Sequence, residues 1–213
     1  METTRTQEQL DAVAFAGQTL GPFFSQDPKQ GDAGGLYRAF SQLDVEASAA
    51  EWPFAAQGDA LEALQQMSSS LAQGIDGICE EYRRLFVGPA KKAAPPWGSV
   101  YTDHEGVIFG STALDLHEWL SSKQVVVTAD DRLPDDHIGR MLELMAWIAH
   151  KRPEILDDYL RLHLLTWAGH FFERVVDESR DAFFTGLAKL SSCTLSGIQA
   201  EFCLQVEIPK FYR

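Results

Sequence analysis

Apolar residues recur at every third or fourth position along most of this chain, which is the spacing of one buried face of a helix. The clearest run has steps of four, three, four and three: Leu71, Ile75, Ile78, Tyr82 and Leu85. Asp59 is a candidate N-cap for this helix, and Gly88-Pro89 should end it. The alternation of apolar and polar residues that marks a half-buried strand is nearly absent. The pattern therefore predicts an all-α protein.

Further apolar stripes predict helices over residues 10–24, 36–43, 111–120, 136–149, 155–176 and 181–202. Ser111 and Asp181 are candidate N-caps for two of these helices. The acidic turn Asp130-Asp131 lies between two predicted helices and is a candidate hinge. We therefore expect a single two-lobed helical domain, with lobes at roughly 1–125 and 135–213 and a hinge between them.

The chain carries 31 acidic and 18 basic residues, which gives a formal net charge of −13. This charge repels phosphate backbones, so nucleic acid is not an expected ligand and cationic partners are favoured. Acidity also has a plainer explanation, because it keeps a protein dissolved. No apolar stretch reaches the roughly 20 residues that a membrane span needs, and residues 1–11 lack the apolar part of a secretory signal. We expect a cytoplasmic protein without stable membrane insertion.

Motifs of the common enzyme classes are missing, including the nucleophile elbow, the phosphate loop and the dinucleotide-binding glycine fingerprint. The histidines and cysteines lack metal-ligand spacing, so no metal is expected. Because the phosphate loop is missing, no other cofactor is expected either. The pair Asp135-Asp136 beside His137 suggests general acid–base chemistry, but an Asp before an apolar stripe is first of all an N-cap. No catalytic residue is predicted. The alternative hypothesis is a small hydrolase or nucleotide-binding enzyme that uses Asp136 and His137.

The segment from Tyr82 to Phe109 is unusually rich in proline, glycine and aromatic residues, and its part between residues 87 and 99 should form a loop. Proline pre-orders such a loop, while Trp97 and Tyr101 offer large apolar surfaces with a polar edge. These are the properties of a peptide-binding surface. They also suit a segment in which Pro96 and Trp97 fill the core, and the residues alone leave both interpretations open.

Two motifs carry a resemblance to a known family. The first is Tyr82-x-x-Leu85-Phe86-x-Gly88-Pro89, followed by Ala94-Pro95-Pro96-Trp97-Gly98-Ser99-Val100-Tyr101-x-Asp103 and Phe109-Gly110. The second is Pro134-x-Asp136-His137-x-Gly139, at the start of a predicted helix. In this order they resemble the motifs of the TorD/DmsD family of chaperones, which bind the twin-arginine leaders of molybdoenzyme precursors. The Pro-Pro-Trp-Gly-Ser-Val block is most similar to the DmsD branch.

The resemblance implies a cytoplasmic chaperone, not an enzyme, whose client is a molybdoenzyme precursor of the dimethyl sulfoxide reductase type. It would bind the twin-arginine leader of this molybdopterin-containing reductase subunit, so that cofactor insertion and assembly precede export by the Tat pathway. Components of the Tat translocase are further expected partners, and the chaperone is expected as a monomer or a domain-swapped dimer. A leader with a basic start and an apolar middle fits a receptor that combines acidic groups with an apolar groove.

The same resemblance assigns leader binding to nine residues: Tyr82, Leu85, Phe86, Pro96, Trp97, Ser99, Tyr101, Asp136 and His137. We expect the apolar part of the leader to lie on a surface that includes Leu85, Phe86, Pro96, Trp97 and Tyr101. Asp136 and neighbouring acidic residues should face the two arginines, with His137 orienting Asp136 or contacting the leader backbone. Adjacent helical residues point about 100° apart, so at least one of Leu85 and Phe86 should fill the core. The largest groove is expected near Trp97 and the start of the 136–149 helix.

Overall fold

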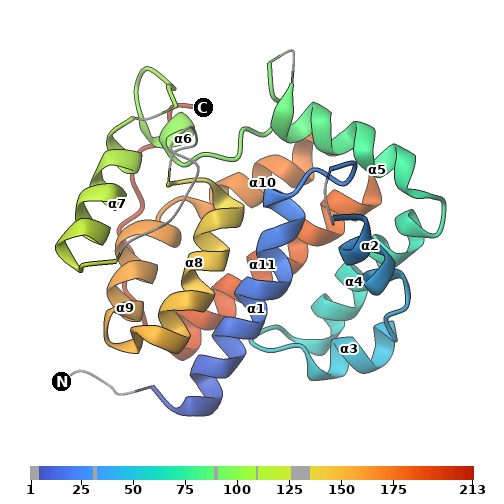
Figure 1. The fold of residues 1–213 in the computed structure, drawn as a ribbon, viewed down its shortest axis with the longest axis horizontal. Coiled ribbons are helices and arrows are strands. Elements are labelled where there is room, and N and C mark those ends of the chain that lie inside the picture. Colours follow the sequence, from blue (N-terminus) through green and yellow to red (C-terminus); the bar gives the residue numbers. More distant parts are fainter. Residues whose placement is uncertain (1–4, 31–32, 89–90, 109, 126–134) are drawn as a thin grey trace. The chain divides into compact units, whose positions relative to one another are not determined.

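The structure is a computed structural model that describes residues 5–30, 33–88, 91–108, 110–125 and 135–213. Its α-helices follow one another in the order shown in Figure 1: α1 (Gln7–Ser25), α2 (Ala33–Ser41), α3 (Val45–Glu51), α4 (Gln57–Leu71), α5 (Ile75–Tyr82), α6 (Ser99–Thr102), α7 (Ser111–Ser122), α8 (Ile138–Lys151), α9 (Leu156–Tyr159), α10 (Ala168–Glu178) and α11 (Ala182–Glu201). The ranges that the structure describes contain no β-strand, only one isolated β-bridge. The all-α prediction is confirmed. None of these helices is both long and apolar enough to cross a membrane.

The predicted helix that begins near Asp59 is interrupted in the structure. Gly74 has a φ of 112°, a conformation that favours glycine, and it separates α4 from α5. Asp59 lies in the first turn of α4, and Ala56 occupies the N-cap position. At the C-terminal helix the prediction is confirmed, because the Asp181 side chain caps α11 by accepting a hydrogen bond from the Phe183 N–H at 2.8 Å. The candidate hinge at Asp130-Asp131 lies outside the described residues.

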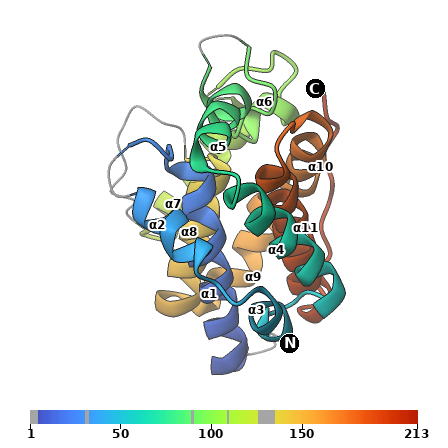
Figure 2. The same ribbon diagram turned by 90° about the vertical axis from the view of Figure 1, so that its right-hand side faces the viewer.

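The chain forms two compact units, each built from segments that are distant in the sequence. Unit 1 contains residues 1–25, 96–171 and 204–213, and unit 2 contains residues 26–95 and 172–203. These units differ from the predicted lobes, because each unit draws on both halves of the chain. The reason is long-range helix pairing: α1 packs along α8 in unit 1, and α4 packs along α11 in unit 2 (Figures 1 and 2).

The helix pair of unit 1 is held close by glycines. A Cβ atom added to Gly17 of α1 would lie 2.3 Å from the Leu142 carbonyl oxygen of α8, and one added to Gly21 would lie 2.8 Å from the Gly139 oxygen. The backbones therefore approach where no side chain separates them. Around this contact the core is filled by apolar side chains such as Leu20 and Phe24, both almost fully buried.

The close approach of α1 and α8 leaves no room for a side chain at Gly17. Gly17→Ala should lower the free energy of unfolding by about 1 to 3 kcal/mol, because the new methyl group meets a backbone atom and the helices must separate. Gly169→Ala is the matched control: Gly169 lies in α10 of the same unit, is exposed and has no atom within 4 Å of the added Cβ. That change should be neutral or stabilising by up to about 1 kcal/mol. Chemical denaturation of both variants checks the prediction, which equal effects would contradict.

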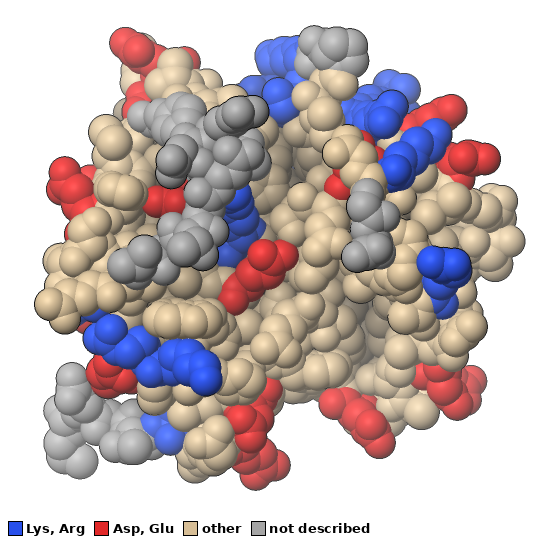
Figure 3. All heavy atoms as spheres, viewed as in Figure 1, with Lys and Arg blue, Asp and Glu red and all other residues tan. Residues whose placement is uncertain are grey.

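Unit 2 has an aromatic core against the α4–α11 pair. Phe184 of α11 lies at edge-to-face geometry with Phe86, at a ring-centroid distance of 5.5 Å, and Tyr37 lies 5.2 Å from Phe183. The buried indole N–H of Trp52 donates to the Thr194 hydroxyl at 2.9 Å. On the face drawn in Figure 3, Lys and Arg side chains gather over the end of α5 and the segment that follows it. The negative charge of the chain is therefore distributed unevenly, and this end of unit 2 does not favour a basic partner.

Candidate functional site

Inside unit 1 the second sequence motif meets the part of the first motif that begins at Pro96. Backbone hydrogen bonds join them in both directions: the Ile138 N–H donates to the Pro96 oxygen at 2.8 Å, and the Gly98 N–H donates to the Asp136 oxygen at 3.2 Å. Trp97 and His137 face each other as an isolated antiparallel bridge. The chain therefore places the start of α8 directly against the segment that leads into α6.

The side chain of Asp136 stabilises this contact. The carboxylate is fully buried, and its Oδ2 accepts a hydrogen bond from the backbone N–H of Ser99 at 2.6 Å. Burial raises the pKa of this carboxyl above its ordinary value, while the hydrogen bond from Ser99 opposes the shift. The interpretation of Asp136 as the N-cap of α8 is therefore wrong. Asp136 binds the first residue of α6, a helix that begins 37 residues earlier in the chain.

His137 is the residue that caps α8. Its Nδ1 accepts a hydrogen bond from the Gly139 N–H at 3.2 Å, which assigns the proton of the neutral ring to Nε2. The ring also lies edge-on to Trp97, at a centroid distance of 5.5 Å. Burial, with a smaller effect of Arg140, lowers the pKa of His137 to about 3. A ring committed to capping and neutral at pH 7 fits a structural role and not that of a general base.

The remaining unit 1 members of the predicted site are core residues. Trp97 is 6% exposed, Ser99 and Tyr101 are 0% exposed, and Pro96 is also buried. The Tyr101 ring stacks on Trp167 at 6.3 Å, and Gly98 approaches Trp167 so closely that an added Cβ would lie 2.6 Å from it. The expectation that these side chains form an exposed docking surface is wrong for this structure, because aromatic packing within unit 1 covers them.

Tyr82, Leu85 and Phe86 belong to unit 2 and are buried as well, at 4%, 0% and 2% exposure. Leu85 and Phe86 lie in a turn of π-helix, Arg83–Val87, which continues α5. The prediction that at least one of this pair fills the core is confirmed, and in fact both do. The wider turn also frees the carbonyl oxygens of Arg84 and Leu85, which accept hydrogen bonds from Ala93 and Ala94. The nine predicted residues thus fall into two groups, each within the core of its own unit.

Comparison with known proteins identifies the family. The family model described as nitrate reductase delta subunit matches residues 54–173, a range that includes both motifs. A protein of Haemophilus influenzae assigned as the Tat proofreading chaperone DmsD is 34% identical over 208 residues, 97% of this chain and 100% of the relative. The Tat proofreading chaperone DmsD of Salmonella typhimurium is 30% identical over 96% of this chain and 98% of the relative.

The chain belongs to the TorD/DmsD family of molybdoenzyme maturation chaperones. Within this family it is less similar to the chaperone protein TorD of Vibrio cholerae, at 27% identity over 68% of this chain and 69% of that protein. A crystal structure of an Archaeoglobus fulgidus protein assigned to redox enzyme maturation has a TM-score of 0.54. It covers 92% of this chain and 98% of its own at 18% identity, so it supports the fold alone. The relatives are chaperones, which confirms that the chain is not an enzyme.

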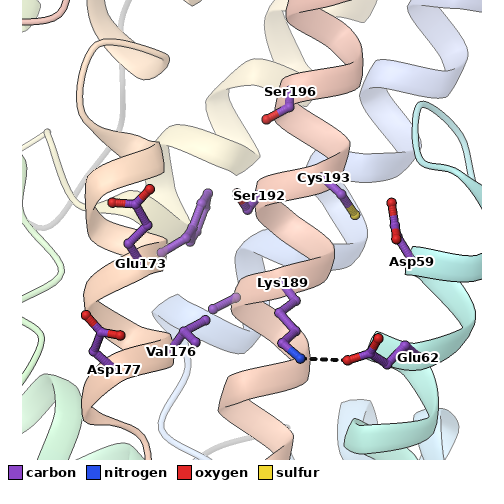
Figure 4. A pocket seen from close by; sticks show the side chains of 11 residues that line it. Asp59, Glu62, Glu173, Val176, Asp177, Lys189, Ser192, Cys193 and Ser196 are labelled. Carbon is purple, nitrogen blue, oxygen red and sulfur yellow. Dashed lines mark hydrogen bonds and ion pairs between the residues drawn. The ribbon is translucent and has the colours of Figure 1, made fainter.

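This TorD/DmsD chaperone also has a pocket that the sequence did not indicate. It lies in unit 2, has a volume of about 710 Å³ and is lined by α4, α10 and α11 (Figure 4). Four carboxylates line it: Asp59, Glu62, Glu173 and Asp177. Each pair is spaced by three or four residues on one helix, which is the spacing of any solvated helix face. The sequence therefore held no signal that would separate these acids from ordinary surface residues.

Proposed function

We propose that this chain is a cytoplasmic chaperone that binds the twin-arginine leader of a molybdoenzyme precursor of the dimethyl sulfoxide reductase type. Binding would hold the precursor until its cofactor is inserted, before export by the Tat pathway. The observation that carries the proposal is the full-length similarity to relatives named as Tat proofreading chaperones DmsD, at 34% and 30% identity. The net charge of −13 favours a client segment that is basic.

The buried residues of the two motifs support the proposal, although they do not themselves form a surface that the leader could contact. Asp136, His137 and Trp97 hold the start of α8 against the start of α6. This contact determines where the segment that follows α6 runs. That segment carries Val107 and Ile108, which are 42% and 40% exposed. We propose that the motif residues act as a frame, and that exposed apolar side chains such as these contact the apolar part of the leader.

Co-purification with two forms of one client tests the proposal. The tagged chaperone is expected to retain a dimethyl sulfoxide reductase precursor and to release most of the leaderless enzyme under the same wash. A precursor whose leader is scrambled is the control for non-specific binding to an unfolded tail. Equal retention of precursor and leaderless enzyme would show that the leader is not the principal target. Retention of the leaderless enzyme in a lasting complex would instead indicate an assembly subunit.

A further inference from the structure

The short helix α6 is held at both ends by residues that are distant in the sequence. We expected Asp136 to face the leader arginines, but its carboxylate is fully buried and accepts the Ser99 N–H at the first residue of α6, at 2.6 Å. In the last turn of α6 the Tyr101 carbonyl oxygen accepts the Tyr212 N–H at 2.9 Å. A helix of four residues is not stable alone, and the carbonyl oxygens of its last turn lack partners within the helix. The segment that contains Tyr212 therefore completes α6.

Tyr212 lies in the segment that follows α11, where the chain returns to unit 1 and runs beside α6 (Figures 1 and 2). We call residues 205–213 the strap. The Phe211 ring of the strap stacks on His170 of α10, at a centroid distance of 4.1 Å and an interplanar angle of 8°. The same histidine lies edge-on to Tyr101 at 5.5 Å. The strap therefore packs on the ring that supports the Tyr101 side chain, and it also bonds the Tyr101 backbone.

The strap is held by contacts at one end only. The Arg213 carbonyl oxygen accepts a hydrogen bond from His170 Nε2 at 2.7 Å, and the Tyr212 ring lies edge-on to His104 at 5.3 Å. By contrast, residues 205–209 are mostly exposed and form no hydrogen bond, ion pair or ring contact with the described part of the chain. The strap therefore detaches once the contacts of its last three residues are lost.

The contact with His104 connects the strap to the segment that follows α6. The hydrogen bonds within this segment are local, because the N–H groups of Glu105 and Gly106 both donate to Asp103, at 3.1 and 3.0 Å. The Tyr212 ring reaches the same segment from a distant part of the sequence. The order of the segment therefore depends on a contact that the strap supplies as well as on its own turn.

We propose that the strap is a positioning device: it closes the second end of α6 and so orders residues 103–108, with Phe211 and Tyr212 as its positioning residues. The consequence for binding rests on the proposed function, in which Val107 and Ile108 of this segment contact the leader. A segment that is ordered before binding loses less entropy in the complex. An attached strap should therefore favour leader binding, and a detached strap should weaken it.

Hydrogen exchange of the chain without any ligand tests the strap. Tyr212→Pro removes the N–H that bonds Tyr101, and the amides of Glu105 and Gly106 should then exchange about 5-fold faster, as expected for the loss of one hydrogen bond. Ile208→Pro is the matched control, because it makes the same change in the strap at an exposed residue that forms no hydrogen bond with the described residues. It should change both rates less than about 2-fold. Equal rates in the two variants would overturn the proposal.

Phe211→Ala tests the side-chain anchor independently, because it keeps every backbone N–H and removes only the stack on His170. It should speed the exchange of the same two amides about 3-fold, while Phe211→Trp retains an aromatic face and should exchange at nearly the wild-type rate. Amides of α11 in unit 2 should exchange at the same rate in all variants. A matching acceleration in α11 would overturn the proposal, because the strap would then support the whole chain and not this segment.

Titration of the same variants with the leader peptide of a dimethyl sulfoxide reductase precursor measures the consequence for binding. Phe211→Ala should weaken binding about 3-fold, and Phe211→Trp should bind like the wild type. Unchanged binding by Phe211→Ala would contradict the positioning role. Tighter binding would contradict it too, because the strap would then compete with the leader. If the wild type binds no leader, the proposed function fails, while the exchange rates still decide whether the strap orders the segment.

Discussion

Trp97→Ala should lower the free energy of unfolding by about 3 to 5 kcal/mol, the loss expected when a large aromatic side chain is removed from a packed core. Trp97 is 6% exposed, its ring lies against His137, and its backbone joins the segment before α6 to the start of α8. Stabilities of natural domains are about 5 to 15 kcal/mol, so this loss is a large fraction of the total. Denaturant titration at neutral pH measures it.

Trp97→Phe is the matched variant, because it keeps an aromatic ring and most of the buried apolar area and should retain most of the stability. The result also separates two roles for this residue. A Trp97→Ala protein that unfolds with a loss below about 1 kcal/mol would show that the ring is peripheral. The side chain would then be available to a leader, as the sequence alone suggested.

Acidification should destabilise the protein through its buried histidines. Burial lowers the pKa of His137 to about 3 and that of His163 to about 4, against about 6.5 in an unfolded chain. The unfolded state therefore binds a proton first, and stability is lost as pH falls below 6.5. Each histidine contributes a slope of about 1.4 kcal/mol per pH unit, or roughly 2 kcal/mol between pH 6.5 and pH 5.

His137→Asn isolates one of these contributions, because asparagine is a good N-cap but has no titratable ring. Between pH 6.5 and pH 5 the difference in stability between this variant and the wild type should shift by roughly 2 kcal/mol in favour of the variant. Asp136 acts in the opposite direction, since its raised pKa means that its contribution is present below pH 3.8 and lost as pH rises. Asp136 is present in both the wild type and the variant, so its contribution cancels in the difference in stability between them. His117→Asn, at an exposed site, controls for the loss of an imidazole. A constant difference across this range would refute the burial of His137.

The sequence predicted the helices well, because their signal is local. Apolar residues one turn apart indicate a helix whatever it packs against, and Asp181 could be recognised as a cap from its position before such a stripe. The break at Gly74 was missed, because the apolar stripe continues on both sides of the glycine. The units were also missed: which helices pair across the chain depends on close contacts such as that of Gly17 with Leu142.

Of the candidate site, the sequence predicted the meeting of two segments but not their burial. A tryptophan beside prolines gives the same local sequence whether it lies in a docking surface or in a core. Only the packing of Tyr101 and Gly98 on Trp167 distinguishes the two cases. Asp136 and His137 are adjacent residues that can both cap a helix, so spacing could not show that His137 caps α8 while Asp136 binds Ser99. Both assignments required the folded chain.

Calorimetric titration of the intact chain with the leader peptide of a dimethyl sulfoxide reductase precursor measures leader binding itself. We expect saturable binding with a dissociation constant in the micromolar range or somewhat tighter, which is a binding free energy of about −8 to −10 kcal/mol. The leaderless enzyme, titrated under the same conditions, should bind at least about 10-fold more weakly, a difference of about 1.4 kcal/mol. Equal affinity for the leader and the leaderless enzyme, or no heat with the leader at all, would contradict the assignment of this chain as a leader-binding chaperone.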